Sequence, residues 1–177
     1  MLLTYSKDPL LATARFLVAT IIGVLAFAGV IVAIGLGAVL TMQRSEIHSK
    51  LSAAGASDSG YMLIVTALVL VIALLAFAAL FMRELFRIVG SVEQQDPFQP
   101  INADRLRSMG WFTVGSQIIL FALAGIASWF GGFKQALLAE DAMVAGTTAL
   151  VLTLVLFILA RVFRVGAEMR SELEGTV

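Results

Sequence analysis

The sequence is short of the residues on which most soluble enzymes depend. It has no cysteine, one histidine and three prolines, and only 14% of its 177 residues are charged. The missing cysteine excludes disulfides, thiolate metal sites and a cysteine nucleophile, and the single histidine, His48, excludes a histidine-rich metal site. The net charge of +0 excludes an overall basic field that would attract nucleic acid. With no recognisable catalytic motif or phosphate-binding glycine loop, we expect neither an enzyme nor a cofactor.

Apolar residues, by contrast, are in excess and make up 60% of the chain. Soluble domains average about 45–50% apolar and about 25% charged residues. Here the apolar residues gather in four windows between consecutive charges, and each window is at or near the length of ~20 residues that a helix needs to cross a bilayer. The sequence therefore predicts an all-α integral membrane protein, a bundle of four transmembrane helices at about 17–40, 61–82, 111–131 and 143–162.

The basic residues predict the orientation of this bundle. With four spans, the N-terminus, the middle loop 83–110 and the C-terminal tail 163–177 share one side of the membrane. That side and the adjoining span ends hold nine basic residues, against three on the other side. The positive-inside rule then places both termini in the cytoplasm.

Local signals predict how the helices begin and end. Asp8-Pro9 is a helix cap followed by proline at the first helical position, so the first helix is expected to start before its membrane span. Asn102 is expected to cap the third helix, with Asp104 in its first turn. The fourth helix meets no proline and is expected to project towards Leu173.

The four windows between charges contain no ionisable residue, which is evidence against an ion pathway or a proton relay. The most polar intramembrane residue is Gln117, for which we expect an interhelical hydrogen bond. Small residues recur at four-residue spacing, and this pattern favours packing within one chain over the alternative of a homo-oligomer interface. They are Ala19 and Gly23, Ala33 and Gly37, and Ala124 and Ser128.

Two predicted cytoplasmic segments contain the distinctive residues. In the middle loop, prolines flank Phe98, and Arg105, Arg107 and Trp111 follow. Turn formation and interfacial anchoring explain Arg107 and Trp111, but they do not explain the cluster of Pro97, Phe98, Pro100 and Asn102. In the tail, an apolar stripe is expected to dock on the middle loop or on a partner, and Arg164 and Glu168 are spaced for an ion pair. The stripe consists of Val162, Phe163, Val165, Met169 and Leu173.

These two segments resemble the DUF2975 family of small bacterial four-helix membrane proteins. The matching residues in the middle loop are Asp96-Pro97-Phe98, Asn102, Arg105-Leu106-Arg107 and Gly110-Trp111. Those in the tail are Val162-Phe163-Arg164, Gly166 and the run from Glu172 to Val177. The resemblance implies a location in the bacterial inner membrane, no settled enzymatic activity, and a partnership with a small helix-turn-helix regulator of the Xre type.

Three functions remain open from the sequence. The first is a membrane anchor or sensor that binds the cytoplasmic regulator, with no direct nucleic-acid contact of its own. The second is a small transporter, and the third is a structural subunit of a larger membrane complex. The residues expected to bind a partner are Asp96, Pro97, Phe98, Asn102, Arg105, Arg107, Trp111, Arg164, Glu172 and Glu174.

Overall fold

The computed structural model describes residues 9–41, 60–93, 98–129 and 140–174, and four long helices account for nearly all of them. No strand occurs in these ranges. The helices are α1 (Pro9–Thr41), α3 (Gly60–Glu93), α4 (Pro100–Trp129) and α6 (Glu140–Glu174). All four are long and apolar enough to cross a membrane. The predicted fold class, an all-α protein with four membrane-spanning helices, is confirmed, and the chain is a multi-pass membrane protein.

The helices are longer than the predicted spans, mainly at their charged ends. α1 starts at Pro9 and α6 continues past Leu173, both as predicted. The middle segment is mostly helical, because α3 runs on to Glu93 and α4 already begins at Pro100. Charged residues mark where a helix leaves lipid, but they do not end it. A proline ends a helix because it cannot donate the next backbone hydrogen bond. At the first position of a helix, by contrast, a proline is favoured.

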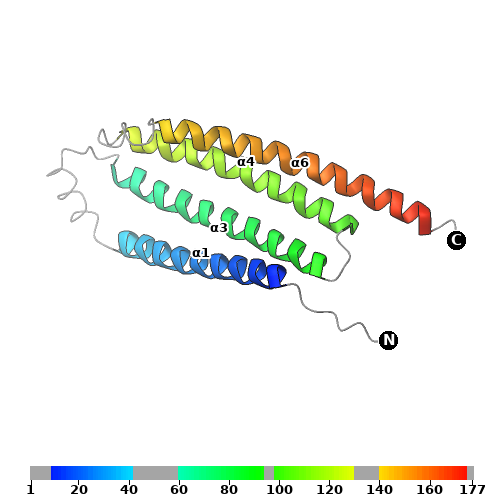
Figure 1. The fold of residues 1–177 in the computed structure, drawn as a ribbon. Coiled ribbons are helices and arrows are strands. Elements are labelled where there is room, and N and C mark those ends of the chain that lie inside the picture. The colour runs from blue at the N-terminus through cyan, green and yellow to red at the C-terminus, as the bar shows by residue number, and fades with distance from the viewer. Residues whose placement is uncertain (1–8, 42–59, 94–97, 130–139, 175–177) are drawn as a thin grey trace.

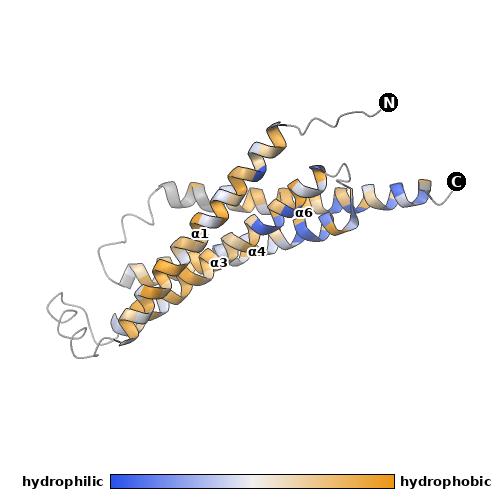
Figure 2. Ribbon diagram, turned by 90° about the horizontal axis from the view of Figure 1, so that it is seen from below, coloured by the Kyte–Doolittle hydropathy of each residue, from blue (hydrophilic) through white to orange (hydrophobic). Residues whose placement is uncertain are grey.

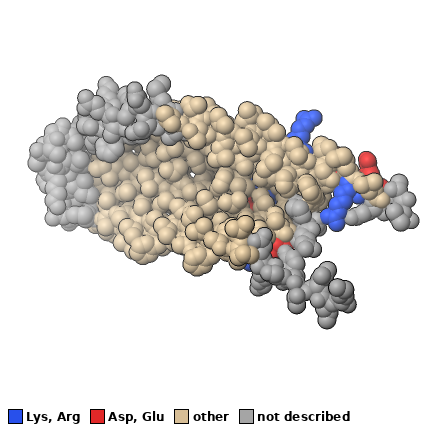
Figure 3. All heavy atoms as spheres, viewed as in Figure 1, with Lys and Arg blue, Asp and Glu red and all other residues tan. Residues whose placement is uncertain are grey.

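The four helices pack in chain order as an antiparallel row. Extensive interfaces join α1 to α3, α3 to α4 and α4 to α6, and no other pair among the four described helices has a comparable interface. Figure 1 shows that the start of α1, the end of α3, the start of α4 and the end of α6 lie at the same end of the row. We call this end, beyond Arg83, Arg107 and Arg161, the polar end. Charged side chains gather there on the face shown in Figure 3.

Arg83, Arg107 and Arg161 lie at one level across three helices, where the charged ends meet the apolar spans, and we take this level as the membrane boundary. Arg83 adjoins Glu84, which pairs with Arg105. Arg107 and Arg161 lie between the Asp104–Arg164 ion pair and the Gly110–Phe157 contact on the antiparallel helices α4 and α6. From this level the three helices run roughly 32–35 Å to their far ends at 1.5 Å per residue. That length matches the ~30 Å core of a bilayer.

Along the spans, large apolar side chains face outward. Phe27, Phe121 and Leu150 are each about two-thirds exposed or more, as expected of lipid-facing residues, and Figure 2 shows the spans as predominantly hydrophobic ribbon. Hydroxyls within the spans bond to the preceding helical turn, which satisfies them without an interhelical partner. This is the case for Thr20, Thr66, Ser116, Thr148 and Thr153.

Close helix packing does not use the small residues that the sequence suggested. Ala19, Gly23, Ala33 and Gly37 are exposed, and a Cβ added at either glycine would meet nothing within 4 Å. The prediction that these pairs pack within the chain is therefore wrong for α1, because their face of α1 points away from α3. Different glycines admit aromatic rings: Gly110 receives Phe157 of α6 and Gly115 receives Phe77 of α3, while Gly166 receives Phe98 from the connection before α4.

Candidate functional site

The polar end and the turn just inside it form the best-packed region of the described chain. A buried cluster of Leu106, Met109, Leu156 and Ala160 joins α4 to α6, and Phe81, Leu85, Ile88 and Phe163 pack against it. α3, α4 and α6 therefore share one apolar core at this level. Such a core fixes the relative positions of the polar side chains around it, which makes this end the candidate functional site.

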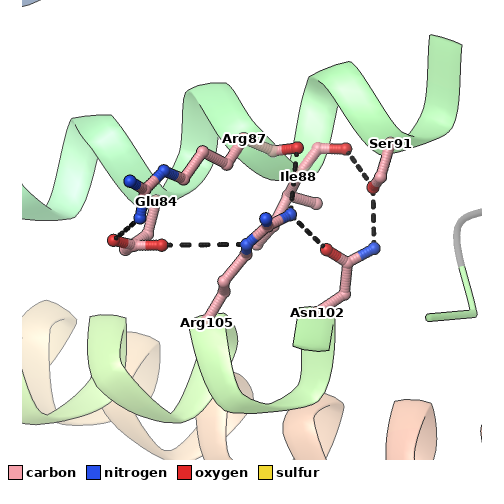
Figure 4. A network of polar contacts seen from close by, with 6 residues as sticks. All are labelled: Glu84, Arg87, Ile88, Ser91, Asn102 and Arg105. Atoms are coloured by element: carbon pink, nitrogen blue, oxygen red, sulfur yellow. Dashed lines mark hydrogen bonds and ion pairs between the residues drawn. The ribbon is translucent and has the colours of Figure 1, made fainter. Parts of the chain in front are cut away.

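Asn102 connects α3 to α4 at the polar end and is completely buried. Its side-chain amide donates a hydrogen bond of 2.7 Å to Ser91 Oγ, and Ser91 in turn donates one of 2.7 Å to the carbonyl of Ile88. Figure 4 shows this chain of bonds bridging the two helices. The prediction that Asn102 caps its own helix is wrong. α4 begins two residues earlier, so Asn102 lies inside the first turn, and its backbone N–H bonds to the Gln99 carbonyl at 2.9 Å.

Arg105 extends the same network along the interface. Its Nη1 donates to Asn102 Oδ1 at 2.9 Å and to the Arg87 carbonyl at 3.3 Å, and its Nε lies 3.9 Å from Glu84 Oε2. Glu84 also accepts a bond of 2.9 Å from Arg87 Nη1. Every charged group in Figure 4 therefore has a partner. A satisfied, half-buried network of this kind fixes the ends of two helices, and that is a positioning role.

A second ion pair joins α4 to α6. Arg164 Nη2 lies 2.7 Å from Asp104 Oδ1, and both side chains are half exposed or more. The predicted pairing of Arg164 with Glu168 on the same helix is therefore replaced by a contact between helices. It occurs because α4 already extends alongside this part of α6.

Removing this exposed pair should have little effect on stability. Solvent-exposed ion pairs contribute about 0–1 kcal/mol, since water screens them and ordering two long side chains costs entropy. We expect Asp104→Asn and Arg164→Gln each to change the free energy of unfolding in detergent by less than about 0.5 kcal/mol. A decrease of about 2 kcal/mol or more in the free energy of unfolding would show that the pair contributes strongly to the packing of α6 on α4.

Phe98 lies in the connection before α4, and its ring packs against α6. Its ring lies 5.4 Å from the ring of Phe163, and it packs on Gly166, where an added Cβ would lie 3.1 Å from the ring. This contact confirms that Phe163 docks on the middle segment. The other stripe residues do not follow it: Val162, Val165, Met169 and Leu173 remain between 44% and 72% exposed.

At the other edge of the row, α1 is joined to α3 by one charged contact. Arg15 Nη1 lies 2.8 Å from Glu93 Oε2, and the guanidinium lies 4.9 Å from the centre of the Phe86 ring. Cation–π contacts at partly exposed sites contribute about 0.5–1 kcal/mol. From the sequence, Arg15 is predicted only as one of the nine basic residues on the cytoplasmic side.

The structure brings together several of the residues predicted to bind a partner. Asn102 and Arg105 lie in the α3–α4 network, and Phe98 and Arg164 contact elements on either side of the α4–α6 interface. Trp111 is exposed and meets Phe157 edge-on at 5.7 Å, one turn from Arg107 towards the membrane. Glu172 is exposed near the end of α6. Asp96, Pro97 and the side chain of Glu174 lie outside the described part of the chain.

Other predicted features behave differently. Gln117 is half buried and has no hydrogen-bond partner among the described residues, so the expected interhelical bond is not seen there. The sequence does not single out Ser91 and Glu84, which partner Asn102 and Arg105, or Glu93, which partners Arg15. Ser91 follows Gly90 in an otherwise apolar turn, and that isolated polar residue was the only available signal. Among the described residues, no group of His, Asp or Glu is arranged to hold a metal ion.

Comparison with known proteins gives one match. The family model described as "Protein of unknown function (DUF2975)" matches residues 46–177. This range includes α3, α4 and α6, and therefore the whole α3–α4–α6 core of the polar end, but it leaves out α1. Neither a curated protein nor a solved structure matches the chain. Because the family model covers most of the sequence, the chain belongs to the DUF2975 family.

Proposed function

We propose that this membrane protein is a non-enzymatic anchor or sensor that holds a small helix-turn-helix regulator of the Xre type at the cytoplasmic face of the bacterial inner membrane. The partner class is what the resemblance to the family implies. The excess of basic residues at the polar end supports a cytoplasmic location for that end.

The observation that carries the proposal is an exposed apolar stripe on α6. Val162, Val165, Met169 and Leu173 follow one another at spacings of three and four residues, which places them on one face of the helix. They begin at the membrane boundary and continue beyond it, where α6 projects past the other helices (Figure 1). Apolar side chains beyond the membrane gain free energy only by being covered. A helix face with apolar residues at this spacing commonly docks into a groove of a protein partner.

The polar end supplies what an anchor needs besides the stripe. The buried core shared with α4, together with the contact of Phe98 with Phe163, holds α6 against α4, so the projecting stripe has a fixed direction. A sensor further requires two states that differ in affinity for the regulator. A shift of α6 relative to Phe98 would alter how the stripe is presented, which gives the proposal a specific mechanical step.

Two charges placed in the stripe should release the regulator. We expect the double variant Met169→Asp/Leu173→Asp to reduce recovery of a DNA-binding protein in mild detergent at least about tenfold, because burying an unpaired carboxylate is costly. Transcription of the regulator's targets should change in parallel. The matched control is Ser171→Asp, which adds a carboxylate on the opposite face of the same turns of α6 and should change neither measurement.

A photoreactive residue identifies the partner directly. Placed at position 169 in living cells, it should attach to a protein that contains a helix-turn-helix, whereas the same residue at position 171 should not. The proposal is wrong if both positions label the same proteins equally, or if the protein captured from position 169 has no DNA-binding helices.

A further inference from the structure

A groove between α4 and α6 lies at the membrane boundary. It encloses about 420 Å³, and its apolar floor consists of Phe157, Ala160 and Val165. Its cationic lining consists of Arg107, Arg161 and Arg164, and Glu168 lies at its outer end. The groove is open to one side, so a ligand can enter from the bilayer without crossing the protein.

The positions of the arginines follow from the register of the two helices. Arg107 lies midway between Asp104, which pairs with Arg164, and Gly110, which receives Phe157. On the antiparallel helix, Arg161 lies between Arg164 and Phe157 in the same way. Arg107 and Arg161 are therefore level with each other on the two sides of the groove.

These two arginines are not compensated by the described part of the protein. Neither forms an ion pair with a described residue, whereas Arg164 is neutralised by Asp104. Glu168 is exposed and lies one turn beyond Arg164, away from the membrane. Two level guanidinium groups with no carboxylate between them repel each other, and an anion placed between them removes this repulsion.

The surroundings of the groove select the kind of anion. Arg107 and Arg161 are the first charges met on leaving the apolar parts of α4 and α6, so they lie where lipid phosphates lie. On the membrane side of Arg161, Leu154, Phe157 and Ile158 share its face of α6, and Leu154 and Ile158 are exposed. A ligand with a phosphate and an attached hydrocarbon chain fits both parts of this surface.

We propose that the groove binds the headgroup of an anionic phospholipid, with its phosphate between Arg107 and Arg161 and an acyl chain along α6. Guanidinium groups form paired hydrogen bonds to phosphate oxygens, and basic pockets between membrane helices at the cytoplasmic face bind anionic headgroups. The inference rests on the position of the groove and on its charges, and it holds whether or not a regulator binds to the stripe.

The test measures lipid binding to the full-length protein purified in a neutral detergent. Phosphatidylglycerol is titrated onto the delipidated protein and the bound lipid is counted by native mass spectrometry, with phosphatidylcholine as the uncharged comparison. We expect phosphatidylglycerol to bind more tightly. Arg107→Gln or Arg161→Gln should weaken its binding about fivefold each, and the double variant about twentyfold.

Arg83→Gln is the matched control. Arg83 is an exposed arginine at the same level on α3 and has no ion pair with a described residue, but it does not line the groove. Its replacement should change phosphatidylglycerol binding less than twofold. An equal loss in this variant would show that any boundary arginine suffices and would overturn the proposal.

Two further experiments complete the test. The first distinguishes a lipid headgroup from a soluble anion, and the second is used if the variants misfold. Inorganic phosphate at millimolar concentration should not displace the lipid; displacement would assign the groove to a soluble anion and overturn the lipid proposal. If the double variant loses its helical circular dichroism signal, the proposal is tested without a substitution. The unaltered protein is then reconstituted in bilayers of equal phosphatidylglycerol and phosphatidylcholine content, and the lipids that co-purify with it are measured. Co-purification of an excess of phosphatidylglycerol supports the proposal, and equal recovery of the two lipids refutes it.

Discussion

Replacing Asn102 by alanine should lower the free energy of unfolding by about 2–4 kcal/mol. The side chain is completely buried and bonds to both Ser91 and Arg105. Its loss leaves a guanidinium hydrogen of Arg105 and an oxygen lone pair of Ser91 without that partner, in a space that water enters poorly. Hydrogen bonds to charged groups contribute about 1.5–3 kcal/mol, and an unsatisfied buried group costs a similar amount.

The measurement is reversible unfolding in mixed detergent micelles, compared with Ser108→Ala. Ser108 also lies near the start of α4, but it forms no hydrogen bond with a described residue, so its replacement should be nearly neutral. The double variant Ser91→Ala/Asn102→Ala should cost about 1 kcal/mol less than the two single losses added together, because the partners act as a pair. Strict additivity, or equal effects of Asn102→Ala and Ser108→Ala, would contradict the network.

Replacing Gly115 by leucine should also destabilise the protein strongly, by about 1–3 kcal/mol. A Cβ at this position would collide with the ring of Phe77 on α3, and that ring lies 5.9 Å from the ring of Phe112. The aromatic pair must therefore move, and α3 and α4 must separate near the middle of their interface.

Gly125→Leu supplies the control for this variant. Gly125 lies on the same helix, and nothing lies within 4 Å of an added Cβ there. Both substitutions make the same change in helix propensity, so their difference isolates the collision with Phe77. If the two variants unfold at the same detergent concentration, α3 and α4 do not pack at Gly115 as described.

Much of the fold could be predicted from the sequence because lipid imposes a simple rule. Uncharged windows of about twenty residues must be helical, and α1, α3, α4 and α6 each contain one such window. The helix ends were harder to predict. The charged residues after Arg83 predict a loop there, although only the prolines that follow provide a physical reason for a helix to stop.

The candidate site could be predicted as a set of residues but not as a set of contacts. The sequence singles out Asn102 and Arg105 but not their partners Ser91 and Glu84. It also predicts Asp104 only as a first-turn residue, not as the partner of Arg164. Which residues face one another depends on the register of antiparallel helices. That register is set here by rings resting on Gly110, Gly115 and Gly166, and a single sequence does not distinguish these glycines from Gly23 or Gly125.

The row-like order of the helices has a consequence for communication across the molecule. Among the described helices, α1 has its extensive interface with α3, and no comparable interface joins α1 to α6. A displacement of α1 therefore reaches α6 mainly by way of α3, which contacts α1 through Glu93 and also packs on the core that α4 and α6 share. Removing the Arg15–Glu93 contact should loosen α1 and leave the contacts of Asn102 and Phe98 in place.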